Sequence, residues 1–248
     1  MIEAHALAGL PEVRPGDDLG GLLARAAGDA LRAGEVLVVA HKVVSKAEGR
    51  VVALNAIDPG PQARRLADEH GKDPRLVQAI LDDSAELLRA SHGVLITRTP
   101  HGFVCANAGI DQSNAASPGD LIRLPTDPDA SARALRARLR ALTGAAPAVV
   151  IGDSFGRAWR HGQCDVAIGI AGLRALDDWR GRPDSRGRDL RATAIAVADQ
   201  AAAAADLARD KASRQPAVVV RGLERHVTED DGQGAAALVR PLAEDLFR

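Results

Sequence analysis

The sequence is poor in aromatic residues, cysteine, net charge and long apolar runs, and each shortage argues against certain classes of protein. Aromatic residues make up 2% of its 248 residues and tyrosine is absent, so the core must be built from Val, Leu, Ile and Ala. The formal net charge is -1, so no overall field draws the chain toward nucleic acid or a membrane surface. A polyanionic ligand would have to be met by local groups of basic residues.

The cysteines and the apolar runs also bear on where the protein works. Cys105 and Cys164 fit neither a CxxC motif nor a zinc-ligand spacing, which favours two reduced, buried thiols over a disulfide. There is no run of about 18 apolar residues to cross a bilayer, and the first residues lack the basic and apolar regions of a signal peptide. We therefore expect a cytoplasmic protein with neither a membrane nor a nucleic acid as partner.

Short apolar runs predict strands, which lie at residues 35–40, 93–99, 102–109, 121–125, 148–151 and 216–222. The second and third of these are joined by a Pro-His-Gly turn that is typical of a hairpin. The segment that begins at residue 41 is expected to turn into another strand. Because hairpins argue against a purely parallel sheet, strands interleaved with helices indicate an α+β or α/β fold.

Helical periodicity predicts helices near residues 19–33, 61–70, 74–81, 127–143 and 192–200. Asp17 or Asp18 is placed to cap the first helix, and Gly34 is expected to end it. A short helical or turn element is expected in the tail, residues 232–248.

The helix at 127–143 has the clearest pattern. Asp129 or Ser131 is expected to cap it and Gly144 to end it. One face carries apolar residues and the other carries arginines, and the apolar face consists of Leu135, Leu139 and Leu142. We interpret the basic face as solvated surface, because the aromatic residues that stack on bases are missing.

A dense group of polar residues follows the strand at 148–151. Asp153 and Ser154 come directly after it, at the end of a strand where α/β proteins place metal and phosphate ligands. Mg²⁺ and Mn²⁺ prefer oxygen ligands and take only one or two protein carboxylates beside phosphate oxygens. Taken alone, a cap for the following segment explains Asp153 equally well.

Cationic side chains stand next to these carboxylate and hydroxyl groups. Arg157, Arg160 and His161 fall within what the glycines indicate is one small loop. The guanidinium fork fits phosphate or carboxylate oxygens, so the group points to an anionic substrate. Lys42 and Lys46 follow the strand at 35–40 and could neutralise a triphosphate, although solvent-facing lysines of a strand connection explain them equally well.

A further polar group lies at Asp111 and Asn114, after the strand-like run at 102–109. Taken alone, these residues favour a turn, because Asp and Asn bond to their own backbone. The chain has neither the GxxxxGK[ST] of a P-loop nor a GxGxxG. Taken together, the carboxylates, the cations and the glycines describe a site for phosphoryl transfer, where positioning and charge neutralisation provide most of the catalysis.

Several long motifs in a fixed order resemble the coenzyme F420-0:L-glutamate ligase family, also called F420:gamma-glutamyl ligases. They are LPEVRPGDDL, KVVSKAEGR, HGFVCANAGID-SN, DSFGRAWR-GQ-DVAIG and VADQAAAAADL. The resemblance runs from about Leu10 to Arg248. It implies an α+β fold with mixed and antiparallel sheets, and an intertwined homodimer. It also implies a single domain over residues 1–248, with a smaller subdomain near 60–145.

The resemblance also implies an activity. Members of the family add L-glutamate to the deazaflavin coenzyme precursor F420-0 and then extend the gamma-linked tail, using GTP and Mn²⁺ or Mg²⁺, with two ions expected. The mechanism implied passes through an acyl phosphate, which the glutamate amine attacks. The partners expected are therefore F420-0, L-glutamate, GTP and a second copy of the chain.

Site residues follow from the matching motif positions. Asp111 and Asp153 are implied as metal ligands, and Ser154 as a ligand to a second ion. The positions matched to GTP contacts are Leu10, Pro11, Glu12, Val13, Lys46 and Asn114, and residues 209–215 align loosely with a further nucleotide loop. We hypothesise that Arg157 or Arg160 holds substrate phosphate or carboxylate, so that both belong with the carboxylates to the catalytic group.

The chain departs from the family pattern at two places. Relatives often read TSKVVSK where this chain has Ala40 and His41 before KVVSK, so a hydroxyl is missing and His41 is expected to take its place at the nucleotide. The usual FGRPWRNGQTD is FGRAWRHGQCD here, which changes the polarity of that segment at His161 and Cys164.

Two other functions share some of these features. A metal-dependent phosphotransferase or phosphohydrolase acting on another phosphorylated metabolite would use the same carboxylates and arginines. A non-catalytic nucleotide-binding protein is favoured only by the altered AHKVVSK. Glutamate-dependent release of GDP separates the ligase from both.

Overall fold

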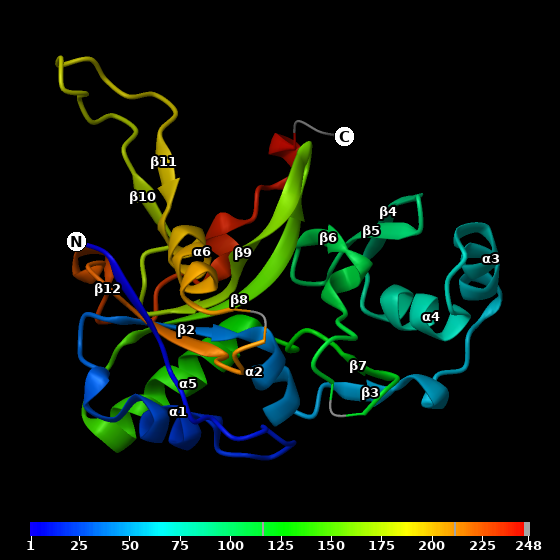
Figure 1. The fold of residues 1–248 in the computed structure, drawn as a ribbon. Helices are drawn as coiled ribbons and strands as arrows, with labels where there is room; N and C mark the ends of the chain where they lie inside the picture. The colour runs from blue at the N-terminus through cyan, green and yellow to red at the C-terminus, as the bar shows by residue number, and fades with distance from the viewer. Residues whose placement is uncertain (116, 211, 246–248) are drawn as a thin grey trace.

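A five-stranded mixed sheet forms the centre of the fold, in the strand order β1-β12-β2-β8-β9 (Figure 1). The structure is a computed structural model that describes residues 1–115, 117–210 and 212–245. The strands are β1 (Glu3–Ala6), β12 (Ala217–Arg221), β2 (Val36–Ala40), β8 (Ala148–Arg157) and β9 (Arg160–Ala171). Only β2 and β8 pair in parallel, and the other neighbours are antiparallel. The expected α+β class with mixed and antiparallel sheets is confirmed.

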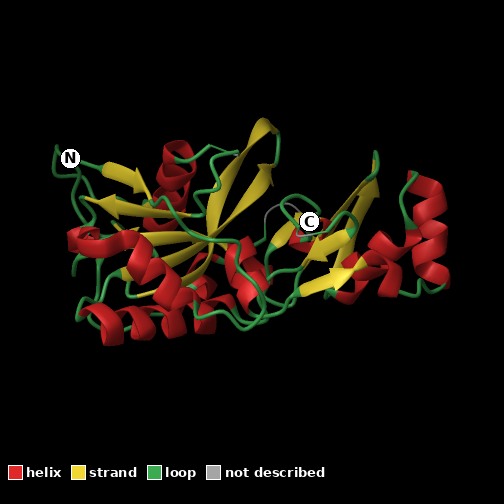
Figure 2. Ribbon diagram, turned by 60° about the horizontal axis from the view of Figure 1, so that its bottom comes forward, coloured by secondary structure: helices red, strands yellow, loops and turns green. Residues whose placement is uncertain are grey.

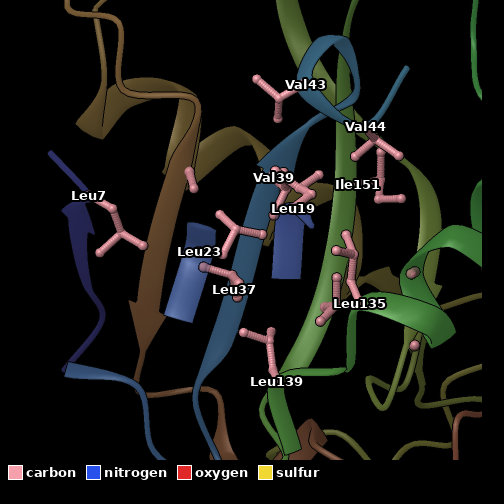
Figure 3. Packing of buried hydrophobic residues seen from close by; sticks show 14 of the residues in the cluster. Leu7, Leu19, Leu23, Leu37, Val39, Val43, Val44, Leu135, Leu139 and Ile151 are labelled. Atoms are coloured by element: carbon pink, nitrogen blue, oxygen red, sulfur yellow. The ribbon is translucent and has the colours of Figure 1, made fainter. Parts of the chain in front are cut away.

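Helices cover both faces of this sheet, which explains why its central strands are continuously apolar. On one face lie α1 (Leu19–Ala27), α2 (His41–Ala47) and α5 (Pro128–Thr143), and Figure 3 shows Leu23 and Leu139 near Leu37 of the sheet. On the other face lies α6 (Val197–Ala208), which packs four alanines into the core there, Ala198, Ala201, Ala202 and Ala205. Small side chains there let the helix approach the sheet closely.

A second group of elements has its own core and lies at one end of the molecule (Figure 1; Figure 2). It contains the helices α3 (Pro61–His70) and α4 (Pro74–Asp82) and an antiparallel sheet of β4 (Glu86–Ser91), β5 (Val94–Arg98) and β6 (Val104–Ala106). The predicted helices at 61–70 and 74–81 and the predicted hairpin are confirmed. The strand β4 was not predicted.

Two small strand pairs complete the fold. The pair of β3 (Val51–Ala53) and β7 (Asp120–Ile122) connects the two groups of elements, and β7 positions the site described below. The pair of β10 (Leu176–Asp178) and β11 (Ala194–Ala196) is the base of a long arm that projects from the sheet (Figure 1). Short 3-10 turns lie at Gly28–Ala30, Leu54–Ala56, Asn107–Gly109, Glu224–His226, Ala235–Leu238 and Leu242–Glu244. The last two fall in the predicted tail element, of which residues 246–248 lie outside the described residues.

Three helix predictions need correction. The helix predicted at 192–200 begins only at Val197, because residues 194–196 pair with β10 as the strand β11. Asp18 caps α1 through its contact with the backbone N–H of Gly21, but the helix ends at Gly28, not at Gly34, because Gly28 takes a positive φ of 50°. The cap of α5 is Asp127, followed by a Pro at the first helical position, while the predicted Asp129 instead accepts hydrogen bonds from the N–H groups of Ile170 and Ala235. The predicted end at Gly144 is confirmed.

The two faces of α5 are also less uniform than predicted. Arg136 is buried, and its guanidinium donates to the carbonyl oxygens of residues 228–230 and to Asp231. Leu142, predicted on the apolar face, is exposed. The arginine is buried because the turn after the sheet offers a ring of carbonyl acceptors that sequence periodicity does not reveal.

The segment that begins at residue 41 was predicted to turn into a strand, and it does so only at β3, because residues 41–47 first form the helix α2. Val43 and Val44 lie in this helix although β-branched residues favour strands, and both pack into the core beneath the sheet. The helix begins directly where β2 ends, so its first residue stays at the edge of the sheet.

The glycine-rich stretch 152–169 is a long hairpin, not a small loop. β8 and β9 continue past the sheet and pair as far as Arg157 with Arg160. Gly169 lies where a Cβ would come within 2.3 Å of the carbonyl oxygen of Pro128, which explains that glycine by close packing against α5. Cys105 and Cys164 are free thiols as expected, but Cys164 is half-buried rather than buried.

Candidate active site

The candidate site lies where the parallel pairing of β2 with β8 ends. β2 and β8 pair in register, Val39 with Ile151 and Ala40 with Gly152. The next residues, His41 and Asp153, are therefore neighbours, as expected for the carboxyl edge of parallel strands. His41 opens α2, while Asp153 remains in β8.

Three side chains from distant parts of the sequence meet at this edge. The Nε2 atom of His41 lies 3.1 Å from Oδ2 of Asp111 and 3.2 Å from Oδ1 of Asp153. His41 is 1% exposed and Asp153 is 7% exposed, so both charges are largely removed from water. One ligand atom from each of the three residues lies within 4.8 Å of the other two.

The buried histidine is strongly coupled to the two carboxylates. Burial disfavours the imidazolium, but the charges of Asp153 and Asp111 and their hydrogen bonds outweigh it and raise the pKa of His41 to about 9. Burial likewise works against the charged form of Asp111, yet hydrogen bonds and charges from His41 and Lys42 hold its pKa below its ordinary value. Without a bound cation, the imidazolium therefore neutralises part of the negative charge.

Asp111 reaches the site through the β3–β7 pair. Its backbone exchanges hydrogen bonds with Ile122 of β7, which fixes the loop that follows β6. Lys42 secures the same loop, because its Nζ lies 3.2 Å from Asp111 and donates to Ser113 at 2.8 Å. These contacts fix the loop in place, so that the carboxylate of Asp111 lies over the edge of the sheet.

A second polar group lies beside the first. Across the β8–β9 hairpin, Ser154 pairs with Asp165, and its Oγ donates to Oδ1 of Asp165 at 2.6 Å. Asp165 is fully buried and forms an ion pair with Arg209, which itself donates to the carbonyl of Pro216. The backbone N–H of Ser154 donates to Oδ1 of Asp153 at 2.7 Å, which connects the two groups.

Both groups border a cavity of about 600 Å³. Its walls come from the segment before α1, the start of α2, the loop after β6, the hairpin and the loop after α6. The lining residues assigned above to the nucleotide or the metal are Leu10, Pro11, Glu12, Val13, His41, Lys46, Asn114, Asp153 and Ser154. Asp111 hydrogen-bonds to His41 and forms an ion pair with Lys42, and both of these line the same cavity.

Basic side chains face the cavity although the chain as a whole carries almost no net charge. Lys46 is 7% exposed and pairs with Glu12 at 2.5 Å, and Lys42 and Arg209 also line the walls. In this structure, each of these cationic side chains contacts a carboxylate. Residues 209–215 were aligned loosely with a nucleotide loop, of which residue 211 lies outside the described residues. All its described members except Ser213 border the cavity, namely Arg209, Asp210, Ala212, Arg214 and Gln215.

The structure does not bring every predicted residue to the cavity. Arg157 and Arg160 sit at the exposed tip of the β8–β9 hairpin, outside the walls formed by the described residues. Arg157 donates to the carbonyl of His161 at 2.6 Å, which stabilises the turn around Trp159. These arginines therefore face solvent beyond the cavity of a single chain.

Sequence reasoning missed Asp165 as a site residue and used Arg209 only loosely. Asp165 lies inside the quoted polar stretch, but its role depends on the pairing of β9 with β8, which places it opposite Ser154. A signal was available: two apolar strands joined through a glycine-rich segment predict a hairpin, and a hairpin register would have paired the two residues.

The fold and the site define a broad class. Two carboxylates and an imidazole at a sheet edge, beside a cavity lined by lysine and arginine, are typical of proteins that bind a divalent cation together with an anionic, phosphorylated ligand. In the described part of the chain, none of the helices is long and apolar enough to cross a membrane.

Comparison with known proteins identifies the family. Residues 9–222 match the model of the F420-0:Gamma-glutamyl ligase family, and the chain belongs to it. A coenzyme F420:L-glutamate ligase of Methanopyrus kandleri is 46% identical over 96% of this chain and 94% of its own length. One from Methanothermobacter thermautotrophicus is 44% identical over 97% of this chain and 96% of its own. The resemblance inferred from the motifs is confirmed.

The buried Asp165–Arg209 pair yields a stability prediction. Asp165→Asn keeps the acceptor for Ser154 but turns an amide toward Arg209, so that a mostly buried guanidinium loses its counter-charge. We expect the free energy of unfolding to fall by about 3 kcal/mol, measured by urea denaturation. The matched control is Asp178→Asn, which removes the exposed pair with Arg180 and should leave the unfolding free energy almost unchanged. Equal effects of the two variants would contradict the assignment.

Proposed function

We propose that this protein is a ligase that adds L-glutamate to coenzyme F420-0 and extends the gamma-linked glutamyl tail, using GTP and a divalent cation. Family membership and the names of relatives that cover nearly the whole chain support the ligase activity. The observation that carries the proposal is the meeting of Asp111 and Asp153, 42 residues apart in sequence, at one edge of a basic-lined cavity.

The cavity suits a nucleoside triphosphate. Its volume of about 600 Å³ falls in the usual range for small-molecule sites. We place the phosphates near Lys42 and Lys46 at the start of α2, where the ammonium groups would exchange their present carboxylate partners for phosphate oxygens. Residues 10–13 and Asn114 then contact the remainder of the nucleotide.

The residues present fit a divalent cation. The buried carboxylate of Asp153 and the half-buried carboxylate of Asp111 lie close together, and oxygen-rich sets of this kind hold Mg²⁺ or Mn²⁺. Asp111 and Asp153 would hold one ion, and Ser154 would lie near a second. A cation bound there would neutralise phosphate charge and so make the terminal phosphoryl group easier to transfer.

The chemistry follows from the substrates. The terminal phosphoryl group of GTP moves to the acceptor carboxylate, which breaks the bond to the GDP oxygen and forms an acyl phosphate. The amine of glutamate then attacks the carbonyl carbon, the carbon–nitrogen bond forms, and phosphate leaves while the amine loses a proton. In both steps the lysines lower the cost of bringing anions together, and the rigid strand ends hold the groups in place.

The binding site that we propose for the acceptor F420-0 extends beyond the cavity of one chain, because it includes the hairpin tip. F420-0 carries a phosphate diester and a carboxylate, so we assign Arg157 or Arg160 at the hairpin tip to bind one of these groups. A homodimer, as implied by the family resemblance, would supply the remaining wall. We further infer a cytoplasmic enzyme, since GTP and glutamate are cytoplasmic metabolites.

The activity is tested by incubating the protein with F420-0, GTP, Mn²⁺ and L-glutamate and analysing the product by mass spectrometry. We expect added glutamyl units and GDP release that depends on glutamate. Asp153→Asn should lower the rate by at least about 100-fold with the fold retained, because a ligand carboxylate is lost.

Other outcomes of this assay favour the alternatives. GDP release without glutamate addition would indicate a phosphohydrolase or phosphotransferase, and nucleotide binding without any turnover would indicate a non-catalytic protein. Either result would contradict the proposed ligase activity.

The hairpin arginines give a second kinetic prediction. Arg157→Leu and Arg160→Leu each change an exposed residue, so the thermal midpoint should stay the same. We expect at least one of them to raise the KM for F420-0 about tenfold, since a charged hydrogen bond to an anion is lost. Arg140→Leu, an exposed arginine on α5, is the control. Unchanged kinetics in both hairpin variants would remove these arginines from the site.

A further inference from the structure

His41 is the residue at which the site departs from the family motif. Relatives often carry a hydroxyl residue at this position, before KVVSK, and this chain has an imidazole. The structure places its Nε2 atom between the two carboxylates at 3.1 and 3.2 Å, so that it contacts the metal-ligand pair as well as bordering the nucleotide cavity.

We propose that His41 is a nitrogen ligand to the divalent cation held by Asp111 and Asp153, and that it shifts the preference of this site from Mg²⁺ toward Mn²⁺. The inference rests on the metal dependence proposed above, and it assigns His41 to the cation in addition to the nucleotide contact expected from the sequence.

The spacing of the three ligand atoms supports this assignment. Mg²⁺ holds its ligands at about 2.1 Å in octahedral geometry, so ligands at right angles are separated by about 3.0 Å. The Nε2 atom stands 3.1 and 3.2 Å from one oxygen of each carboxylate, which matches two such edges. A cation of this size therefore fits against all three atoms with small side-chain movements.

The histidine is also held in the orientation that a ligand needs. It is the first residue of α2, and its ring is 1% exposed. Its second nitrogen, Nδ1, lies 3.4 Å from Oγ of Ser45, one helical turn further on and fully buried. A partner on the far nitrogen, which fixes the ring and its tautomer, is what metal-binding histidines normally have.

The nitrogen donor changes which cation the site prefers. Mg²⁺ takes oxygen ligands and keeps several waters, whereas imidazole suits transition metals, and affinity for nitrogen-containing sites rises along the first row from Mn²⁺. An oxygen donor at position 41 would leave a site of oxygens alone, which discriminates less between the two ions. The single change of residue type at His41 is thus sufficient to alter the metal preference.

A different role for His41 predicts a different observation. As an imidazolium, it would occupy the space between the carboxylates as an internal cation and would exclude a metal ion from contact with its nitrogen. A metal bound by the carboxylates would then show no bond to nitrogen.

The test uses the full chain loaded with Mn²⁺, alone and with inorganic tripolyphosphate, which carries no nitrogen. Pulsed electron paramagnetic resonance should detect a ¹⁴N nucleus coupled to Mn²⁺, and protein labelled with ¹⁵N-histidine should show the ¹⁵N coupling instead. The labelled protein needs no substitution, so this measurement does not depend on whether a variant folds.

Variants then assign the signal to one residue. His41→Thr should abolish the nitrogen coupling and reduce the ratio of Mn²⁺ to Mg²⁺ affinity at least about fivefold, measured by competition. The matched control is His161→Asn, which changes an exposed histidine at the hairpin tip and should leave both quantities unchanged.

The outcomes separate the two proposals. Bound Mn²⁺ without nitrogen coupling, or a coupling that survives in His41→Thr, overturns the role of His41 and leaves the proposed ligase activity standing. Failure of the wild-type chain to bind Mn²⁺ under either condition overturns the metal site itself, and with it the metal dependence of the proposed function.

Discussion

The parallel pairing of β2 and β8 is the constraint on which the rest of the site depends. Among the described strands of the main sheet it is the only parallel contact, and it brings the carboxyl end of β2, residues 36–40, beside the middle of β8, residues 148–157. His41 and Asp153 become neighbours because of that register. The buried valines and isoleucine on both faces of these strands hold the register, since a shift by one residue would move each side chain to the opposite core and disrupt the packing of both.

Charge is arranged locally in a chain that is nearly neutral. The cations that border the cavity contact carboxylates: His41 and Lys42 contact Asp111, Lys46 contacts Glu12, and Arg209 contacts Asp165. These pairs satisfy buried charges in the free protein, and anionic ligands can replace the more exposed carboxylates without leaving an ammonium group unpaired. Asp165 is fully buried, so its pair with Arg209 is structural, whereas Glu12 is largely exposed and the more readily displaced partner of Lys46.

Sequence reasoning recovered what depends on local pattern and on motif. The helices at 61–70 and 74–81, the hairpin of β5 and β6 and the meeting of Asp111 with Asp153 were all predicted. It failed where tertiary contacts override local preference: the strand predicted in the segment after residue 40 begins only at Val51, since residues 41–47 form α2, and Arg136 was predicted on a solvated face but is buried among carbonyl groups. Asp165 was missed because its partner Ser154 is set by strand register, and a place for His41 between two carboxylates required three distant segments to be positioned together.

The central claim is that Asp111 and Asp153 bind one divalent cation next to the nucleotide phosphates. Crystals grown with Mn²⁺ and a non-hydrolysable GTP analogue, measured at an X-ray energy where manganese scatters anomalously, test it most directly. The account predicts an anomalous peak in contact with both carboxylates and with a phosphate oxygen. A peak elsewhere, or a nucleotide bound away from this sheet edge, would contradict it.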